Sequence, residues 1–366
     1  MPGGAAEAAR FSCATLSVPL DYHHRGSRTV PVAVIRVQAA SPGSRIGSLV
    51  LNPGGPGGSG VDAAIDAATS LPEALRARFD IVGFDPRGVG RTGPVRCWDQ
   101  ARYAAAFRHA RARPHPGAFR AALDEGRRFR PACRRNSGDL APYLGTEFVA
   151  RDLDRLRAAL GDEQLTYLGL SYGTFIGTVY ANLFPKRVRA LALDGAYDPN
   201  RYANHPYAYD RGQYIAVEGA LNRFLAWCAG AGTACHVGDG DPAAALDRLI
   251  GRLDRDDVAV DAFSFLYQIL YAMNGGTPHW TTLADQLRQS ESGEGRLLAP
   301  ISRPEADFLT ANTVVECNDR GLPRLPSAPG PRAHRRSPPR QAPRPRPRLR
   351  TTRPAVEVCD DNPPPG

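Results

Sequence analysis

Three glycine-rich turns, each directly after a short apolar stretch, constrain the fold of this chain more than any other feature. The turns are 52–60 (NPGGPGGSG), 83–93 (GFDPRGVGRTG) and 169–173 (GLSYG). The stretches before them, 47–52, 79–85 and 165–170, are mostly apolar, which predicts buried strands. Glycine permits tight turns and close approach of other backbone, so these turns mark the points at which the strands end.

Helical patterns alternate with the predicted strands. Residues 152–160 have leucines at helical spacing, and residues 175–184 read as a helix that Pro185 ends. Residues 29–37 and 188–194 add two further strands. Strands that alternate with helices predict an α/β fold with a parallel sheet covered on both faces.

The composition of the chain changes twice along its length. Residues 201–315 are rich in Tyr, Ala and Leu with helical spacing, which predicts an inserted helical cap. Residues 321–366 contain thirteen Pro and almost no periodic apolar residues, so they cannot pack a core. We therefore expect residues 1–200 to form the N-terminal part of an α/β core, residues 201–315 a cap, and residues 316–366 a disordered Pro/Arg-rich tail.

The net charge of +9 is concentrated near the C-terminus. Residues 321–366 hold ten Arg against three acidic residues, and the remainder is nearly balanced. That remainder has no basic stripe interleaved with aromatic residues, so we expect no nucleic-acid partner. We also expect no membrane partner, because no apolar run approaches about 18 residues. Residues 1–16 lack a basic region followed by an apolar one, which predicts no signal peptide.

The seven cysteines show no C-x-x-C spacing, so we expect no zinc site, no redox pair and no cofactor. Cys228 and Cys235 are near enough in sequence to close a small loop. This many cysteines fits an oxidising compartment better than the cytosol, and the odd number leaves at least one thiol unpaired.

Ser171 lies at the centre of a G-x-S-x-G pattern between a predicted strand and a predicted helix. That context is typical of a nucleophile elbow, in which the flanking glycines permit a turn that lifts the hydroxyl above the sheet. The helix N-terminus supplies a positive dipole end, and the Tyr172 N–H can face a developing oxyanion. The alternative interpretation is an ordinary glycine-rich turn.

The other two turns admit several interpretations. The turn 52–60 is a flexible connection, a phosphate loop or an oxyanion loop, and the phosphate loop fails because no G-K-[ST] follows. At Gly54 and Gly55 no side chain hinders the approach of backbone N–H groups to a substrate carbonyl, which favours the oxyanion loop. In the turn 83–93, Asp85 and Arg87 suit a structural ion pair better than a catalytic one.

Together the motifs resemble the α/β-hydrolase fold, specifically the secreted tripeptidyl-aminopeptidase-like serine peptidases, near the proline iminopeptidases. The resemblance rests on CATLSVPLDY (13–22), GSLVLNPGGPGGSG (47–60), FDIVGFDPRGVGRTGPVRC (79–97), TEFVARDLDRLRAALG (146–161), LTYLGLSYGT (165–174), YANLFPKRVRALALDG (180–195) and VVECND (314–319). It implies a nucleophile at Ser171, an oxyanion hole from the Tyr172 and Gly55 backbones, and peptide substrates with a free N-terminus. It also implies an extracellular or cell-envelope location.

No histidine follows a strand signal after Ser171, although the fold orders its triad as Ser, acid, His. The histidines after Ser171 are His205, His236, His279 and His334. Each is expected to be a surface, cap or tail residue, so the catalytic histidine stays unassigned. Asp194 ends a predicted strand, where the family has a structural turn, and it is at best a weak substitute acid.

The family-like pattern stops at about Arg320, so we expect a chain truncated before the last strands by a reading-frame change. A natural Pro/Arg tail is the alternative. Three functions compete: a serine exopeptidase impaired by loss of the triad His and Asp, a non-catalytic remnant that binds peptides, and an Arg-rich binder of anionic surfaces. The sequence predicts no oligomeric state.

Overall fold

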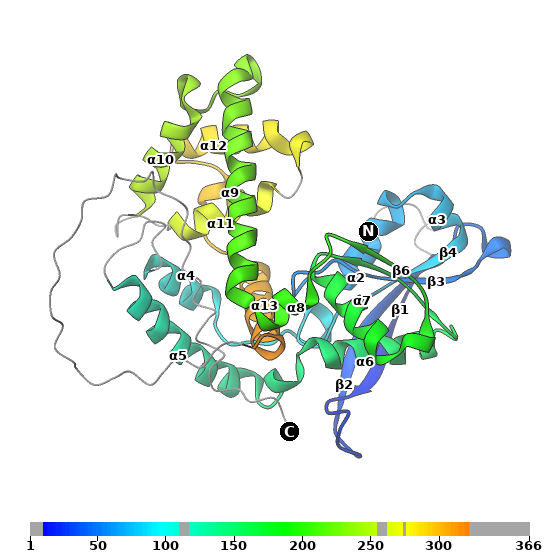
Figure 1. The fold of residues 1–366 in the computed structure, drawn as a ribbon. Helices are drawn as coiled ribbons and strands as arrows, with labels where there is room; N and C mark the ends of the chain where they lie inside the picture. The colour runs from blue at the N-terminus through cyan, green and yellow to red at the C-terminus, as the bar shows by residue number, and fades with distance from the viewer. Residues whose placement is uncertain (1–9, 110–116, 255–261, 274–275, 322–366) are drawn as a thin grey trace.

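The computed structural model describes residues 10–109, 117–254, 262–273 and 276–321 (Figure 1). Within these ranges six strands form one sheet in the order β1-β2-β4-β3-β5-β6. The strands are β1 Phe11–Pro19, β2 Thr29–Val37, β3 Gly47–Asn52, β4 Phe79–Phe84, β5 Leu165–Leu170 and β6 Val188–Asp194. The bounds of β2, β3, β5 and β6 match the expected ranges, and β4 ends one residue early.

The sheet is mostly parallel, as expected, with an antiparallel part at one edge. Strands β4, β3, β5 and β6 run parallel, whereas β1 and β2 form an antiparallel pair and β2 is antiparallel to β4. The short connection 20–28 can join only antiparallel neighbours, since a parallel crossover needs a dozen or more residues. β1 itself was not expected from the sequence.

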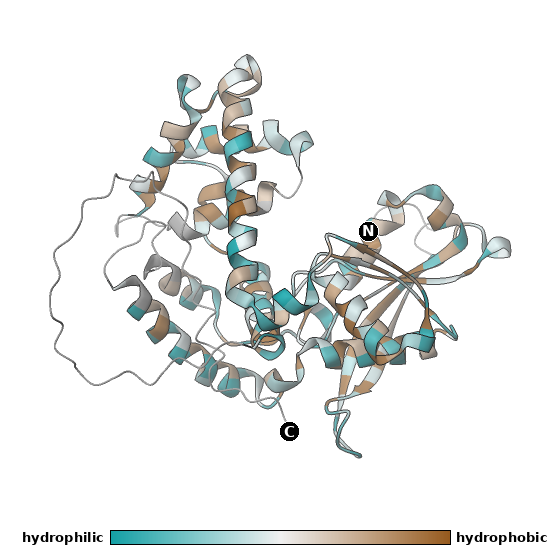
Figure 2. Ribbon diagram, viewed as in Figure 1, coloured by the Kyte–Doolittle hydropathy of each residue, from teal (hydrophilic) through white to brown (hydrophobic). Residues whose placement is uncertain are grey.

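Helices cover both faces of the sheet. They include α2 Gly60–Ser70, α3 Glu73–Arg78, α6 Thr146–Ala159 and α7 Tyr172–Leu183. α2 packs with β2, β3 and β4 in one apolar cluster, and α6 and α7 pack in a second cluster that includes the other face. Both faces of β4 are buried, as expected for a strand between two helical layers. Figure 2 shows hydrophobic residues concentrated along the strands.

The remaining helices lie to one side of the sheet (Figure 1). They are α4 Gln100–His109, α5 Ala118–Ser137, α8 Pro199–Asn204, α9 Pro206–Gly230, α10 Pro242–Leu253, α11 Ala262–Met273, α12 Trp280–Glu291 and α13 Arg303–Asp319. The short 3-10 helices are η1 Pro42–Ser44, η2 Gly90–Thr92, η3 Ala141–Tyr143, η4 Pro185–Arg187, η5 Gly232–Ala234, η6 Val237–Gly240, η7 Thr277–His279 and η8 Arg296–Leu298.

Helix α13 does not share the core of the other C-terminal helices. Helices α9 to α12 bury side chains in a cluster of their own, which includes Phe224 and Phe265, whereas Val314 and Val315 of α13 are buried in the cluster of the sheet. The helix continues to Asp319, past the expected boundary at residues 315 and 316. The reason is that one face of its last turns packs on the sheet cluster. Residues 322–366, on which the predicted tail falls, lie outside the described residues.

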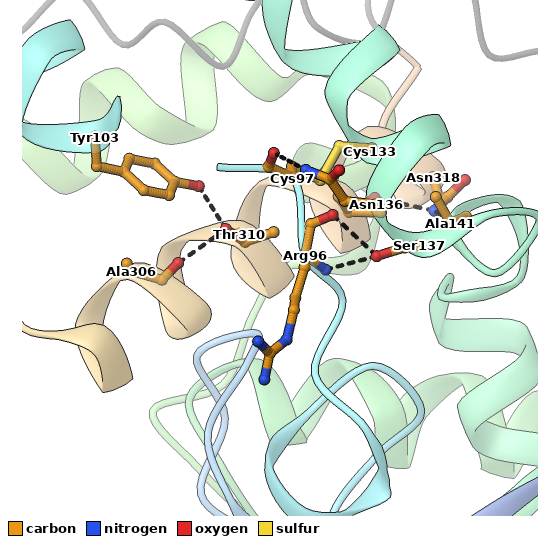
Figure 3. Close-up of a disulfide and its surroundings, with 11 residues drawn as sticks. Arg96, Cys97, Tyr103, Cys133, Asn136, Ser137, Ala141, Ala306, Thr310 and Asn318 are labelled. Atoms are coloured by element: carbon orange, nitrogen blue, oxygen red, sulfur yellow. Dashed lines mark hydrogen bonds between the residues drawn. A yellow bond between two sulfur atoms is a disulfide. The ribbon is translucent and has the colours of Figure 1, made fainter. Parts of the chain in front are cut away.

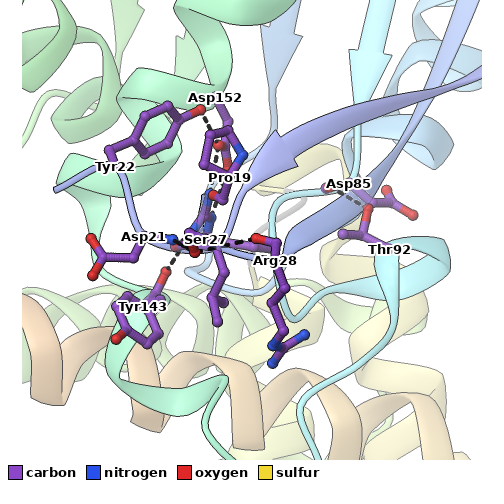
Figure 4. A network of polar contacts seen from close by, with 11 residues as sticks. Pro19, Asp21, Tyr22, Ser27, Arg28, Asp85, Thr92, Tyr143 and Asp152 are labelled. Carbon is purple, nitrogen blue, oxygen red and sulfur yellow. Dashed lines mark hydrogen bonds and ion pairs between the residues drawn. The ribbon is translucent and has the colours of Figure 1, made fainter. Parts of the chain in front are cut away.

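The expected ion pair between Asp85 and Arg87 is wrong, although both side chains are buried and structural. Asp85 accepts hydrogen bonds from the Ser59 hydroxyl (2.6 Å), the Val61 N–H (3.1 Å) and the Arg91 N–H (2.8 Å). It therefore ties the turn 83–93 to the start of α2. Figure 4 shows Asp85 with Thr92, whose hydroxyl donates to the Asp85 carbonyl.

Arg87 instead pairs with Asp152 of α6. Its guanidinium makes two bonds to the carboxylate, at 2.6 and 2.7 Å, and Tyr22 donates to the same carboxylate at 2.8 Å. Arg87 also donates to the carbonyls of Pro19, Leu20 and Tyr143. Figure 4 shows Tyr22 and Asp152 from this network. Sequence spacing could not show this pair, because Asp152 is on a distant helix.

Two disulfides lie within the described residues. Cys228 and Cys235 are bonded as expected, and Cys97 joins the segment after β4 to Cys133 of α5 (Figure 3). Cys317 is also disulfide-bonded, and Cys13 is a free, exposed cysteine. No described helix is both long and apolar enough to cross a membrane.

Candidate active site

Ser171 occupies the sharp turn between β5 and α7. Its backbone has φ 53° and ψ −123°, a conformation that L-residues rarely adopt and that costs about 1–3 kcal/mol. Its side chain is exposed. The neighbouring glycines are required by packing, because a Cβ on Gly169 would lie 2.7 Å from the Gly173 carbonyl carbon. This geometry places the Ser171 hydroxyl at the carboxyl edge of the parallel strands, as in a nucleophile elbow.

Backbone hydrogen bonds hold the turn from both sides. The Ser171 N–H donates to the Asp194 carbonyl at 2.8 Å, and the Thr174 N–H donates to the Ser171 carbonyl at 2.9 Å. Asp194 thus contacts the turn through its main chain. Its side chain is exposed and makes no hydrogen bond or ion pair with the residues the structure describes. The role of Asp194 as a weak substitute acid remains a prediction.

The glycine-rich turn 52–60 packs directly against the elbow. A Cβ on Gly54 would clash with the Leu170 carbonyl and lie 2.9 Å from the Tyr172 nitrogen. The Gly54 N–H donates to Asn52 Oδ1 at 2.9 Å, so it is not free to bind an oxyanion. Among the described residues, the N–H groups of Gly55 and Tyr172 have no acceptor. Of the predicted donors, Gly55 and Tyr172 are therefore available, whereas Gly54 provides the close approach.

A partly buried carboxyl group lies next to the elbow. Asp319, at the end of α13, accepts hydrogen bonds from the Thr146 N–H (2.6 Å) and hydroxyl (2.5 Å). The Tyr172 hydroxyl donates to the same carboxylate at 3.3 Å. Burial raises the pKa of Asp319 to about 7, although the bonds from Thr146 lower it. Burial also raises the pKa of Tyr172 well above its usual value, and the nearby Asp319 adds to that effect.

The sequence did not identify Asp319 or Thr146 as site residues. Both lie within segments that carry the family resemblance, but no spacing joins either of them to Tyr172. Only the packing of α13 on α6 and α7 brings the three side chains together.

No described histidine serves as a base for Ser171. His205, His236 and His279 are all exposed, and they lie between α8 and α9, before η6 and at the end of η7. The Ser171 hydroxyl makes no hydrogen bond with any residue in the described ranges. His334 lies outside those ranges.

The described residues hold no group of three or more His, Cys, Asp or Glu side chains able to bind a metal ion. A hollow of about 570 Å³ is lined by residues of α4, of α5 and of the segment just before α4, including Arg102 and Trp98, and Ser171 is not among its lining residues.

The elbow, the glycine-rich turn before it and the helix-covered sheet define an α/β hydrolase. The family model described as "alpha/beta hydrolase fold" matches residues 47–239, more than half of the chain. The chain belongs to this family.

Relatives from the family carry several names. The chain is 42% identical to the serine protease Hip1 of Mycobacterium tuberculosis over 252 residues, 68% of this chain and 45% of that protein. It is 31% identical to the tripeptidyl aminopeptidase of Streptomyces coelicolor over 339 residues, 86% of this chain and 61% of that protein. It is 43% identical to carboxylesterase B of M. tuberculosis over 230 residues, 62% of this chain and 43% of that protein. The chain thus spans about half the length of these relatives.

Proposed function

We propose that this chain is a serine hydrolase of the peptidase type, with Ser171 as its nucleophile. The observation that carries the proposal is the backbone of Ser171, a non-glycine residue at positive φ with an exposed hydroxyl at the N-terminus of α7. Backbone strain of this kind persists where the surrounding structure enforces it, and it concentrates at active sites. In the reaction, the Ser171 oxygen attacks a carbonyl carbon, and the free N–H groups of Gly55 and Tyr172 bind the resulting oxyanion.

The substrates we propose are peptides with a free N-terminus, from which short peptides are released. Two observations support this choice: the names of the protease and tripeptidyl aminopeptidase relatives, and the resemblance of the sequence motifs to that family. The two disulfides support an extracellular or cell-envelope location, because such bonds persist in oxidising compartments. The carboxylesterase relative makes an ester the natural competing substrate.

The proposed activity of this chain is low. The proton of the Ser171 hydroxyl must pass to a base, and no described histidine contacts it. Loss of triad members in other serine proteases lowers the rate by about 10⁴–10⁶ and leaves roughly 10³–10⁴ over water. Turnover is then expected to be slow, with transfer of the proton to solvent.

A fluorophosphonate probe tests the nucleophile directly. The Ser171 oxygen forms a bond to phosphorus as fluoride leaves, and the hydroxyl proton goes to solvent. We expect one adduct, located on Ser171 by mass spectrometry of proteolytic fragments and absent from Ser171→Ala. Ser70→Ala, which changes an exposed serine at the end of α2, is the matched control and should label like the wild type. Labelling of other serines with Ser171 unmodified would refute the proposal.

Substrate class is tested on the same proteins with a tripeptide anilide and a p-nitrophenyl ester. Slow anilide hydrolysis that Ser171→Ala abolishes supports the peptidase. Hydrolysis of the ester alone would move the assignment to an esterase.

A second candidate function is peptide binding without turnover. The observation in its favour is the Ser171 hydroxyl, which has no hydrogen-bond partner in the described ranges. Calorimetry would favour this function if a tripeptide bound the wild type and Ser171→Ala with equal affinity. The fluorophosphonate should then label neither protein. The interpretation as an Arg-rich binder of anionic surfaces rests on the tail, outside the described residues.

A further inference from the structure

The two free N–H groups of the proposed oxyanion hole belong to segments far apart in the sequence. Gly55 lies after β3, and Tyr172 begins α7. Each must be held in place before the reaction, because an oxyanion hole acts through donors that are already oriented. Both segments contact one further element, helix α13, which comes much later in the chain.

The glycine-rich turn is fixed by the middle of α13. Asn312 donates from Nδ2 to the Pro56 carbonyl at 3.2 Å. The contact around this bond is close, since a Cβ on Gly55 would lie 3.1 Å from the Phe308 ring. A Cβ on Gly57 would lie 2.9 Å from the Phe308 carbonyl oxygen. The turn therefore cannot move toward α13 without a clash, and the Asn312 bond opposes movement away from it.

The elbow is fixed by the end of the same helix. The Tyr172 side chain is buried, and its hydroxyl donates to Asp319 at 3.3 Å. Thr146 braces the carboxylate through its N–H and hydroxyl, and its hydroxyl also contacts the Tyr172 hydroxyl. The Tyr172 ring is fixed at its hydroxyl by Asp319 and Thr146, and at its Cβ by the backbone of α7. Because the N–H belongs to the same residue, these contacts limit rotation of the peptide that carries it.

We infer that α13 sets the geometry of the oxyanion hole, with Asn312 and Asp319 as positioning residues for its two halves. Neither residue contacts the Ser171 hydroxyl, so each acts through the backbone it holds. The inference rests on the proposed function, because it assigns a purpose to N–H groups that the proposal makes catalytic. Loss of one such donor costs about 10²–10³ in rate, and a misplacement of about 1 Å costs up to about 10². Loosening one half is therefore expected to slow reaction about 10- to 100-fold.

Two variants loosen one half each and keep both N–H groups. Asn312→Ala removes the bond to the glycine-rich turn, and Tyr172→Phe removes the bonds to Asp319 and Thr146. Tyr103→Phe is the matched control, because the buried Tyr103 hydroxyl bonds Thr310 of α13 at 2.7 Å (Figure 3), a bond that includes neither the glycine-rich turn nor Tyr172. For each full-length protein, the fluorophosphonate reaction gives a maximal rate constant and a probe concentration at half-saturation.

Hydrogen exchange supplies a readout that does not depend on reactivity. The hydrogen-bonded amides of Gly54 and Gly58 report on the turn, and those of Ser171 and Thr174 report on the elbow. Asn312→Ala should speed exchange in the turn only, and Tyr172→Phe in the elbow only. Both should lower the maximal rate constant about 10- to 100-fold without changing half-saturation, whereas Tyr103→Phe stays within about twofold of the wild type.

Two results would overturn the inference. One is an equal fall of the maximal rate constant in all three variants, and the other is a rate constant within twofold of the wild type in both Asn312→Ala and Tyr172→Phe. If the fluorophosphonate does not label the wild type at all, the proposed function fails. Hydrogen exchange alone then tests whether α13 positions the two N–H groups. Faster exchange confined to the loosened half then supports positioning by α13, and unchanged exchange refutes it.

Discussion

Asp319 gives the protein a pH dependence whose size follows from its burial. The pKa of this carboxyl is raised from 3.8 to about 7 in the folded state, chiefly by burial. Between these values the folded state keeps a proton that the unfolded state has lost. The free energy of unfolding therefore falls as the pH rises from about 4 to about 7. One pKa unit corresponds to about 1.4 kcal/mol, and the slope flattens as the pH approaches 7, so the fall between pH 5 and pH 7 is about 2 kcal/mol.

The variant Asp319→Asn cannot ionise at this position and is expected to lose this part of the pH dependence. All other titratable groups are shared, including Glu316, whose charge also raises the pKa of Asp319. The difference between the two proteins thus isolates one carboxyl. Urea unfolding at pH 5, 6, 7 and 8 should show the variant gaining about 2 kcal/mol on the wild type between pH 5 and pH 7, and little beyond pH 8.

Asp124→Asn is the control, because the Asp124 side chain is 48% exposed and its substitution should leave the slope near that of the wild type. Parallel pH profiles for the wild type and Asp319→Asn would show that the Asp319 carboxyl is not protonated in the folded protein near pH 6. Burial would then not hold a proton on Asp319 in solution.

Three further outcomes are expected. Gly54→Ala should slow fluorophosphonate labelling at least tenfold, because its Cβ would meet the Leu170 carbonyl at a backbone φ of +92°; labelling at the wild-type rate would contradict the packing of the turn on the elbow. Asp152→Asn should lower the free energy of unfolding by about 3–5 kcal/mol in urea titrations, since it leaves the buried Arg87 charge uncompensated; a loss below about 1 kcal/mol would contradict a buried pair. The double substitution Cys97→Ser and Cys133→Ser should cost about 2–4 kcal/mol by the same measurement, and equal stability would mean that the bond is not formed in solution.

The strands were predictable from the sequence because each contains its own signal. β3 and β5 are short apolar runs that end at a glycine-rich turn, and the structure gives them the expected bounds. β1 was missed, since its pattern of mostly exposed residues resembles no buried strand. The antiparallel direction of β1 and β2 could not be predicted, because strand direction depends on the connection and on the neighbouring strand.

Side-chain partners at long sequence distance were not predictable. The sequence pairs Asp85 with Arg87 because they are two residues apart, whereas the fold gives Arg87 a bidentate partner on α6. Asp319 shows the same limit, since its bonds to Thr146 and Tyr172 exist only once α13 packs on the sheet cluster. Ser171 could be proposed from the sequence because an elbow needs glycines at fixed positions near the serine. These glycines form a local motif, which the sequence shows directly.

The strained backbone of Ser171 depends on an exposed strand. Its N–H donates to the last residue of β6, which has β5 as its one strand neighbour among the described residues. The side chains of β6 are exposed or half-buried, whereas those of β4 are all buried. Such a strand opens locally at lower cost than a central one. Opening it removes a constraint that keeps a non-glycine residue at positive φ. The geometry of the nucleophile, and of the Tyr172 N–H that follows it, is therefore sensitive to whatever covers β6, whereas the Gly55 half of the oxyanion hole is held by Asn312 of α13.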